Sequence, residues 1–423
     1  MIVVSHPTGN NYVRAALRAL VETGLLAGFY TTLAFDRSSG WLRLVPTGLR
    51  RELLRRAYDL PPGAARKRPL RETVRLISGR AGWTTLTRYE TGWASIYAVY
   101  RDLDRHVAAR LPGLASRGVR AIYAHLDGAT TSFAAAQELG MRRLYELPIA
   151  YSEVAQRLLE EESRRWPEWA VTMPDLNYSA AKLEADRREL ELADVVFCPS
   201  AFVAESLPAW ARASRQIVVA PFGSPGLAPA SSATPGKTNR GGKLRVLFAG
   251  SMSQRKGLAD LFSAMKLVGR REIELVVMGS LLAPLPFYRR EWADFTYEPT
   301  RPHDDVLALM STCDVFCLPS IVEGRALVIQ EAMSRGLPII ITPNTGADDL
   351  VDDGRTGFLV PVRSPAAIAN RLAWFAEHRE ETRAMGELAR AKAAACSWEN
   401  YGTIITHAIK QDVGSHQALS ATA

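Results

Sequence analysis

Two stretches of alternating strand-like and helix-like pattern, separated by a segment with no apolar period, most constrain the fold of this chain. The first opens with the short apolar run IVVSHP, which is followed by a turn at TGNN and the helical pattern YVRAALRALVETG. The second begins at residue 244 with LRVLFAGS and continues through the runs ELVVMGS, CDVFCLPS and LPIIITP. Strands that alternate with helices indicate parallel, doubly wound sheets. The sequence therefore predicts two α/β domains.

The domain boundary is marked by a change of composition. Residues 224–243 are rich in Pro, Gly, Ser and Ala and predict an interdomain linker. Residues 1–223 would form one domain, and a chain of 423 residues is long enough for a second. In doubly wound domains ligands bind outside the carboxyl ends of the strands, so the cleft between the two domains is the expected site.

The formal net charge of +8 is unevenly distributed. Residues 41–80 hold eleven Lys or Arg against three acids, and the run LRRELLRRAYDL repeats leucine and arginine at helical spacing. A basic amphipathic helix of this kind can lie on an anionic membrane surface, and a solvated basic face is the alternative. No zinc-finger, helix-turn-helix or RNP-type pattern accompanies the charge, so we expect no nucleic acid partner.

Several features favour a cytoplasmic protein. No uncharged apolar run reaches the length of about 18 residues that a spanning helix needs, and the first apolar run is too short for a signal peptide. Four cysteines form no CxxC pair and predict reduced core residues: Cys198, Cys313, Cys317 and Cys396. A membrane contact would then be peripheral, on the inner face. No HExxH, CxxC or well-placed Asp-x-Asp motif is found, so we expect no metal.

The run EGRALVIQEAM, residues 323–333, places two acids in mostly apolar surroundings. The pattern predicts Glu323 in the loop after a buried strand and Glu331 inside the following helix. Carboxylates beside an anion site would accept hydrogen bonds from the hydroxyls of a sugar or ribose, whereas a capping acid and a surface residue are the alternative. The helix N-terminus is a natural phosphate site, and its free N–H groups would come from Arg325, Ala326 and Leu327.

The wider segment PSIVEGRALVIQEAMSRGLPIIITPNTGADDLVDDGRTGFLVPV resembles the retaining glycosyltransferases of family 4, which have the GT-B fold. The Glu-x7-Glu spacing, the EAM, the GLP and the later TGFLVP match the family pattern. The resemblance implies two Rossmann-like, doubly wound domains that face each other across a cleft. Residues 244–397 would bind the nucleotide sugar. A helix over 398–423 would cross back to the first domain, because CSWENYGTIITHAIK resembles the terminal helix of the family.

The same resemblance implies roles for the acids. Glu323 would contact the hydroxyls of the donor sugar or the catalytic centre, and Glu331 would hold the ribose of the nucleotide. The Phe-Gly that is common in the family is Arg325–Ala326 here. Ala326 still offers a backbone N–H, and Arg325 lies either near the diphosphate or in solvent. Asp349 stands where many members have Glu.

The run FAGSMSQRKGLADLF, residues 248–262, predicts a strand that ends at Gly250, a short loop and a helix. Arg255 and Lys256 directly precede this helix, where two cations suit a diphosphate leaving group. An isolated RKG also fits a surface turn. Lys256 matches the lysine of the family, and the resemblance implies that Arg255 replaces the charge of an earlier arginine whose position is held by Ser251.

Two candidates lie in the first domain. His125 ends the strand-like run RAIYAH and matches the last histidine of an H-A-H pattern in the family, which reaches the donor sugar; a structural histidine is the alternative. Tyr123 replaces the first histidine. The loop PTGNN, with Gly9 and Asn10, loosely matches a glycine-rich loop that lies against the diphosphate or acceptor, and a plain turn fits equally well.

The resemblance thus implies a retaining glycosyltransferase that moves a sugar from a nucleotide-diphosphate sugar to a hydroxyl of a glycan or lipid-linked glycan, in bacterial polysaccharide or cell-envelope biosynthesis. It would need no cofactor. A catalytically silent GT-B scaffold and a sugar-nucleotide epimerase are the alternatives. The predicted catalytic residues are Glu323, His125 and Lys256. The predicted donor-binding residues are Arg255, Glu331, Arg325, Ala326, Leu327, Gly250 and Gly9.

Overall fold

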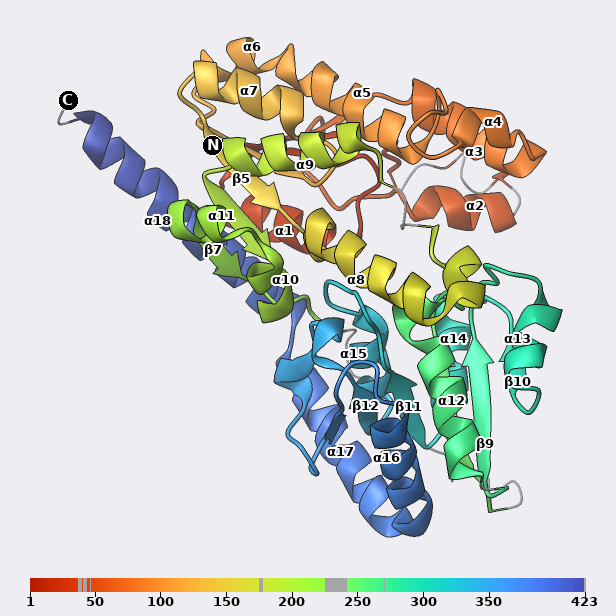
Figure 1. The fold of residues 1–423 in the computed structure, drawn as a ribbon. Coiled ribbons are helices and arrows are strands. Elements are labelled where there is room, and N and C mark those ends of the chain that lie inside the picture. Colours follow the sequence, from red (N-terminus) through yellow and green to blue (C-terminus); the bar gives the residue numbers. More distant parts are fainter. Residues whose placement is uncertain are drawn as a thin grey trace.

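The computed structural model describes residues 1–36, 40, 44, 45, 47–174, 178–224, 242–269 and 271–421. Most of the linker predicted at 224–243 lies outside the described residues, as do 41–43 and 46 of the predicted basic segment. Two α/β bodies are seen in Figure 1, each built on one parallel sheet. The prediction of two doubly wound α/β units is therefore confirmed.

The N-terminal sheet has seven parallel strands in the order β3-β2-β1-β4-β5-β6-β7. Its strands are β1 (Ile2–Ser5), β2 (Leu26–Thr31), β3 (Ala65–Lys67), β4 (Ala121–His125), β5 (Arg142–Glu146), β6 (Val195–Cys198) and β7 (Gln216–Val219). The inner strands β1, β4 and β6 are buried along their whole length, which explains their continuous apolar sequences.

Helices cover both faces of this sheet. They are α1 (Asn11–Glu22), α2 (Thr47–Leu54), α3 (Leu70–Ala81), α4 (Thr84–Thr87), α5 (Ile96–Ala108), α6 (Leu111–Ala115), α7 (Thr130–Glu138), α8 (Ser152–Arg165), α9 (Ala180–Leu192), α10 (Ala201–Ser206) and α11 (Ala209–Ser214). In Figure 1, α5, α6, α7 and α9 lie at the top of the molecule, and α8 runs from this body toward the other.

The C-terminal sheet has six parallel strands in the order β10-β9-β8-β11-β12-β13. They are β8 (Leu244–Ala249), β9 (Ile273–Met278), β10 (Thr296–Glu298), β11 (Val315–Leu318), β12 (Ile339–Ile341) and β13 (Gly357–Leu359). The helices of this body are α12 (Leu258–Val268), α13 (Leu285–Glu291), α14 (His303–Met310), α15 (Leu327–Ser334), α16 (Pro365–Glu377) and α17 (Arg379–Ala395).

The last helix, α18 (Trp398–Ala421), returns to the N-terminal body and lies along α1. The two helices approach closely because Gly402 has no side chain: a Cβ atom there would lie 2.7 Å from the Cβ of Ala19. Tyr401 and Ile405 of α18 are buried in the same apolar cluster as Val4 and Leu17. The terminal helix thus completes one face of the N-terminal sheet.

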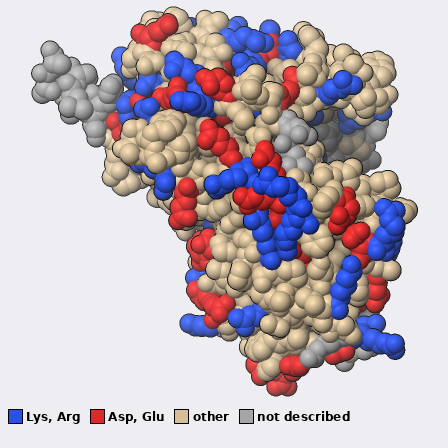
Figure 2. All heavy atoms as spheres, viewed as in Figure 1, with Lys and Arg blue, Asp and Glu red and all other residues tan. Residues whose placement is uncertain are grey.

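One segment of the N-terminal half packs into the other body. It consists of α8 and the 3-10 helix η2 (Pro167–Thr172), and we call residues 152–172 the strap. Trp169 of the strap is fully buried in the core of the C-terminal body. Figure 2 shows basic and acidic side chains close together over the region where α8 meets the C-terminal body.

Candidate functional site

The predicted residues gather at the points where the strand order of each sheet reverses. In the N-terminal sheet, β1 lies between β2 and β4, so the chain leaves in opposite directions on either side of the β1/β4 boundary. The C-terminal sheet has the same arrangement at β8/β11. Such switch points, at the carboxyl ends of the strands, are the usual ligand sites of doubly wound sheets. His125 ends β4, whereas Lys256 and Glu323 follow β8 and β11.

Three predicted charges meet after β8 and β11. Lys256 Nζ lies 2.6 Å from Glu323 Oε1, and Arg255 Nη1 lies 3.3 Å from the same oxygen. Burial raises the pKa of Glu323, but Lys256 and Arg255 outweigh it, so that the pKa of this carboxyl lies below its ordinary value. Glu323 is therefore ionised at neutral pH and holds two cations in place.

Glycines allow this approach of side chain and backbone. Gly250 has φ +151°, and a Cβ atom there would lie 2.7 Å from Cδ of Lys256. The side chain of Lys256 therefore passes so close to residue 250 that only glycine fits there. Gly257 has φ +73°, and a Cβ atom there would lie 2.0 Å from the carbonyl oxygen of Pro319. The RKG run is thus packed tightly against the end of β11 and is not a free surface turn.

Glu331 lies on α15, half-buried, with His303 as its neighbour. The distance from His303 Nδ1 to Glu331 Oε1 is 3.6 Å, and His303 lies at the start of α14. Burial raises the pKa of Glu331, while His303 opposes the shift. The exposed fraction of the Glu331 side chain is 18%, so its carboxylate remains reachable by a hydroxyl group.

The side chain of Arg325 does not face solvent. Its guanidinium is buried and makes two hydrogen bonds with the carboxylate of Asp349, from Nη1 at 2.7 Å and from Nη2 at 3.0 Å. Nη1 also donates to Gly346 O, and Nε donates to Gln330 Oε1 at 3.3 Å. Arg325 therefore holds the start of α15 against the 346–349 loop.

The predicted group of free N–H donors needs a correction. The N–H of Ala326 donates to Thr345 O at 3.2 Å, because the loop before α15 folds back onto the turn after β12, so this donor is engaged within the protein. Leu327 begins α15, and its side chain packs against the apolar cluster of the N-terminal sheet. The preceding Gly324 also meets the N-terminal half, since Ser200 Oγ donates to Gly324 O at 2.7 Å.

Neutral rings line the switch point of the N-terminal sheet. His125 Nδ1 lies 3.0 Å from Ser5 O, and because a carbonyl only accepts, this nitrogen carries the proton. Nε2 of His125 is buried and has no hydrogen-bond partner among the described residues. Burial lowers the pKa of His125 to about 4, so the ring is neutral at pH 7 and offers Nε2 as an acceptor.

His6 is a neighbour that the sequence interpretation missed. Its ring centroid lies 4.5 Å from that of His125, and Nδ1 accepts from the N–H groups of Thr8 and Gly9 at 3.1 and 2.8 Å. Burial, and then His125, lower its pKa well below the usual range. Its position directly after the first buried strand was a signal in the sequence. Gly9 has φ +61° and packs against Tyr58, whose ring would lie 2.2 Å from a Cβ atom there.

Comparison with known proteins identifies the part of the chain that holds the charged cluster. Residues 233–392 match the family described as glycosyl transferases group 1. A D-inositol 3-phosphate glycosyltransferase from Paenarthrobacter aurescens is 26% identical over 179 residues, which cover 40% of this chain and 44% of the relative. The match therefore spans less than half of that relative.

Solved structures resemble the whole chain. Sucrose-phosphate synthase from Thermosynechococcus elongatus superposes with a TM-score of 0.67 at 19% identity, covering 98% of this chain and 99% of the other. Anabaena HepE in complex with UDP superposes with a TM-score of 0.58 at 15% identity, covering 97% and 99%. The expectation of a GT-B fold is thereby confirmed. Among the described residues, no helix combines the length and apolar character that crossing a membrane requires.

Proposed function

We propose that the protein is a retaining glycosyltransferase of family 4, which transfers a sugar from a nucleotide-diphosphate sugar to a hydroxyl of a glycan or lipid-linked glycan. One observation carries the proposal: Lys256 and Arg255 converge on Glu323 at the switch point of the C-terminal sheet. A bound diphosphate would attract both cations and free Glu323 to accept hydrogen bonds from the sugar. The cations would then neutralise the charge that develops on the leaving group.

A uridine nucleotide is the first donor to examine. The Anabaena neighbour is described in complex with UDP and with UDP-glucose. Glu331 would accept hydrogen bonds from the ribose, and the neutral His125 would accept one from the donor sugar. Lys256 and Arg255 supply the positive charge that a metal supplies in other transferases, so the proposed reaction proceeds without a metal. We assign no general base.

The acceptor and the cellular role belong to the same proposal. The enzyme would act in bacterial polysaccharide or cell-envelope biosynthesis, in the cytoplasm. Retention is tested by the anomeric configuration of the product, which NMR reads directly, and metal independence by activity in the presence of EDTA. A silent scaffold and a sugar-nucleotide epimerase remain the alternatives, and the first would bind the donor without producing a glycoside.

The deciding experiment measures thermal stabilisation by nucleoside diphosphates and their sugars, with wild type beside Glu331→Ala. Stabilisation by one nucleotide sugar that is lost in Glu331→Ala would support the donor site and name the donor. Glu387→Ala is the matched control, because Glu387 is an exposed acid on α17. If none of the nucleotides stabilises the wild type, the transferase proposal fails.

A peripheral membrane contact is the second part of the proposal, on the inner face of the membrane. Helix α3, which begins within the predicted basic segment 41–80, exposes 59% of Leu70 and 53% of Ile77. Trp83, two residues after the end of α3, is 56% exposed. Arg80 lies between them on the same helix. Apolar and aromatic side chains beside arginine suit the interface of an anionic bilayer.

Sedimentation with vesicles that contain anionic lipid tests this contact. The double variant Ile77→Ser with Trp83→Ser should remain in solution at a lipid concentration that sediments the wild type. Leu267→Ser is the control, because Leu267 is 63% exposed on α12 of the other body. Equal sedimentation of all three proteins, or of none at low salt, would remove the membrane from the proposal.

A further inference from the structure

The strap, residues 152–172, reaches the donor site from the other half of the chain. Its anchor is Trp169, whose ring centroid lies 5.9 Å from that of Phe262, 5.1 Å from that of Phe287 and 5.7 Å from that of Tyr288. Replacing a fully buried tryptophan by a small residue is among the most destabilising changes in a protein core. The strap is therefore held in the C-terminal body by core packing as well as by charge.

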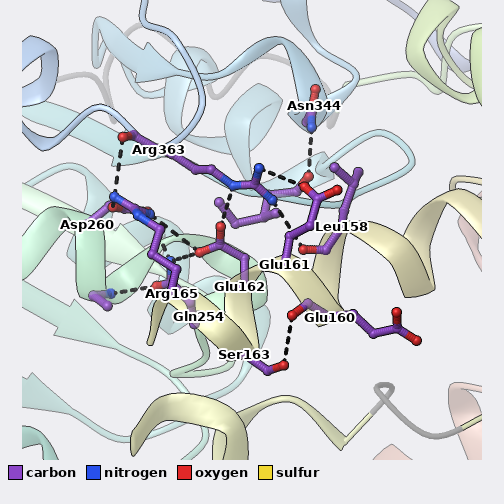
Figure 3. Close-up of polar contacts among 12 residues, drawn as sticks. Leu158, Glu160, Glu161, Glu162, Ser163, Arg165, Gln254, Asp260, Asn344 and Arg363 are labelled. Carbon is purple, nitrogen blue, oxygen red and sulfur yellow. Dashed lines mark hydrogen bonds and ion pairs between the residues drawn. The ribbon is translucent and has the colours of Figure 1, made fainter. Parts of the chain in front are cut away.

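Glu162 is the charged centre of this contact. Its carboxylate is fully buried, Oε2 accepts from Gln254 Nε2 at 2.6 Å, and Oε1 accepts from Nε of Arg363. Arg363 also pairs with Glu161 at 2.8 Å. Figure 3 shows these side chains, together with Arg165, directed toward one another from α8 and from the C-terminal body.

Two arginines, one on the strap and one on the C-terminal body, join the two parts by ion pairs. Arg165 of the strap pairs with Asp260 of α12 at 2.6 Å, and it donates to the carbonyl oxygen of Arg363 at 3.2 Å. Arg363 has φ +64°, a left-handed conformation that is unfavourable for a non-glycine residue. Such a conformation persists where surrounding contacts hold it, and here they are contacts with the strap.

Gln254 connects the strap to the donor site. Its Nε2 donates to Glu162 and also to Asp260 Oδ2 at 2.9 Å, and its Oε1 accepts from the N–H of Ala259 at 2.9 Å. Its backbone N–H donates to Thr172 Oγ1 of the strap at 3.2 Å. Both the side chain and the backbone of Gln254 are thus held by the strap.

Gln254 begins the 3-10 helix η5 (Gln254–Lys256), so the next two residues are the cations of the donor site. The carbonyl oxygen of Arg255 accepts from the N–H of Ile321 at 2.8 Å, which holds the loop that leads to Glu323. On its other side, the N–H of Glu323 donates to Asn344 O at 3.1 Å. An unbroken series of contacts therefore runs from the strap to the three charges.

We propose that Glu162 is a positioning residue of the donor site, which holds Arg255 and Lys256 in place through Gln254. This inference rests on the proposed function. The diphosphate would be recognised only while the strap is seated, although Glu162 itself does not touch the donor. Replacing Glu162 by Gln would turn an amide donor toward groups that are themselves donors, and a buried network that is only partly satisfied loses its geometry.

Affinity for phosphates separates this role from a merely structural one. The probes are UDP, GDP and ADP, each beside its free nucleoside, with calorimetry for the nucleotides and ligand-observed NMR for the nucleosides. Glu162→Gln should weaken the binding of the selected diphosphate about tenfold, which is within the range of measured coupling between sites. The affinity of its nucleoside, which carries no phosphate, should stay unchanged.

Glu160→Gln is the matched control, because Glu160 lies exposed on the same helix and the change in charge is the same. Gln254→Met is the second variant: it removes the amide link but leaves the ion pairs of the strap in place. It should reproduce the loss for the diphosphate even if Glu162→Gln fails to fold. The melting temperature of each variant shows whether it is folded at the temperature of the measurement.

The outcomes are distinct. A loss confined to the diphosphate in both variants supports the inference. Equal weakening of diphosphate and nucleoside assigns the strap a structural role only and overturns it, as does unchanged binding in Gln254→Met. If the wild type binds none of the three diphosphates, the proposed function fails together with this inference, whereas wild-type binding that the variants retain removes the inference alone.

Discussion

The two halves of the candidate site use opposite chemistry. After β8 and β11, a buried carboxylate holds two cations within 3.3 Å, so this side is built from paired charges. After β1 and β4, the neighbouring groups are the rings of His6 and His125, whose pKa values are lowered by burial, so this side is uncharged at neutral pH. A fixed ionic ligand suits the first side, and hydroxyl groups suit the second.

The difference in chemistry also explains why sequence motifs identify the charged side more readily than the neutral side. A diphosphate has the same shape and charge in every nucleotide sugar, so a site for it needs particular residues at particular spacings. The transferred sugar differs from one nucleotide sugar to another, so residues that contact its hydroxyl groups have no such constraint. The family match over residues 233–392 includes the three charged residues, whereas His6 and His125 both lie before its first residue.

The largest expected effect comes from breaking the charged side. Lys256→Met removes the cation nearest to Glu323 and should lower kcat/KM for the nucleotide sugar about 10²- to 10³-fold, since preorganised charges at the leaving group supply this order of stabilisation. Lys266→Met is the control, because Lys266 is exposed on α12. Steady-state kinetics decide the matter: a loss of less than threefold would mean that Lys256 does not serve the leaving group.

An intermediate effect is expected on the neutral side. His125→Asn keeps a donor that can reach Ser5 O but withdraws the acceptor Nε2, which should lower kcat/KM for the nucleotide sugar about tenfold, the value of one hydrogen bond. Binding of the nucleoside diphosphate should not change, because it lacks the transferred sugar that His125 would contact. His407→Asn on the exposed part of α18 is the control.

The direction in which pH affects the acceptor role of His125 follows from its pKa. Because the pKa of His125 is lowered to about 4, its acceptor nitrogen stays available throughout the neutral range and is lost only as pH falls toward that value. The pH profiles of wild type and His125→Asn should therefore have the same shape near pH 6.5, with no inflection that is present in the wild type and absent from the variant. An inflection of that kind would show that the ring is charged in the working enzyme and would remove its role as an acceptor.

Local patterns were sufficient for part of this site. The fold class followed from alternating strands and helices. The motifs and the family resemblance assigned Lys256 and Glu323 to one site, whereas their contact at the ends of two adjacent strands emerged only from the structure. Arg325 could not be placed, because its partner Asp349 lies 24 residues away on a separate turn. The contact between Glu162 and Gln254 joins residues 92 positions apart and depends on how the strap enters the other body.

Trp169 illustrates the same limit. Nothing in the run RRWPEWAVT tells to which core its tryptophan belongs, since burial against either sheet would satisfy the same apolar pattern. Residues within a motif inherit its geometry, whereas contacts between distant segments arise only when both bodies and the segment between them have been placed.

The smallest expected effect concerns Glu146, a buried residue next to the neutral side. Glu146 is the register partner of His125 on β5 and is fully buried. Its Oε2 accepts from the hydroxyl groups of Tyr123 and Tyr401, while Oε1 has no partner among the described residues. Burial raises the pKa of Glu146 from 4.5 to about 8, although the two tyrosines oppose the shift. The carboxyl is therefore mostly protonated near pH 7, which keeps this side of the site uncharged.

The sign of the resulting stability change follows from proton binding. Between pH 4.5 and about pH 8 the folded state holds a proton on Glu146 that the unfolded state releases, so the contribution of Glu146 to stability falls as pH rises through this window.

Glu146→Gln cannot titrate and keeps an acceptor for the tyrosines. Its melting temperature should match the wild type at about pH 5 and exceed it by about 2–4 °C at about pH 8.5. Glu138→Gln, exposed on α7, should show no such divergence. Parallel melting curves for Glu146→Gln and wild type would mean that the carboxyl is ionised in the fold, and the neutral side would then hold a buried charge after all.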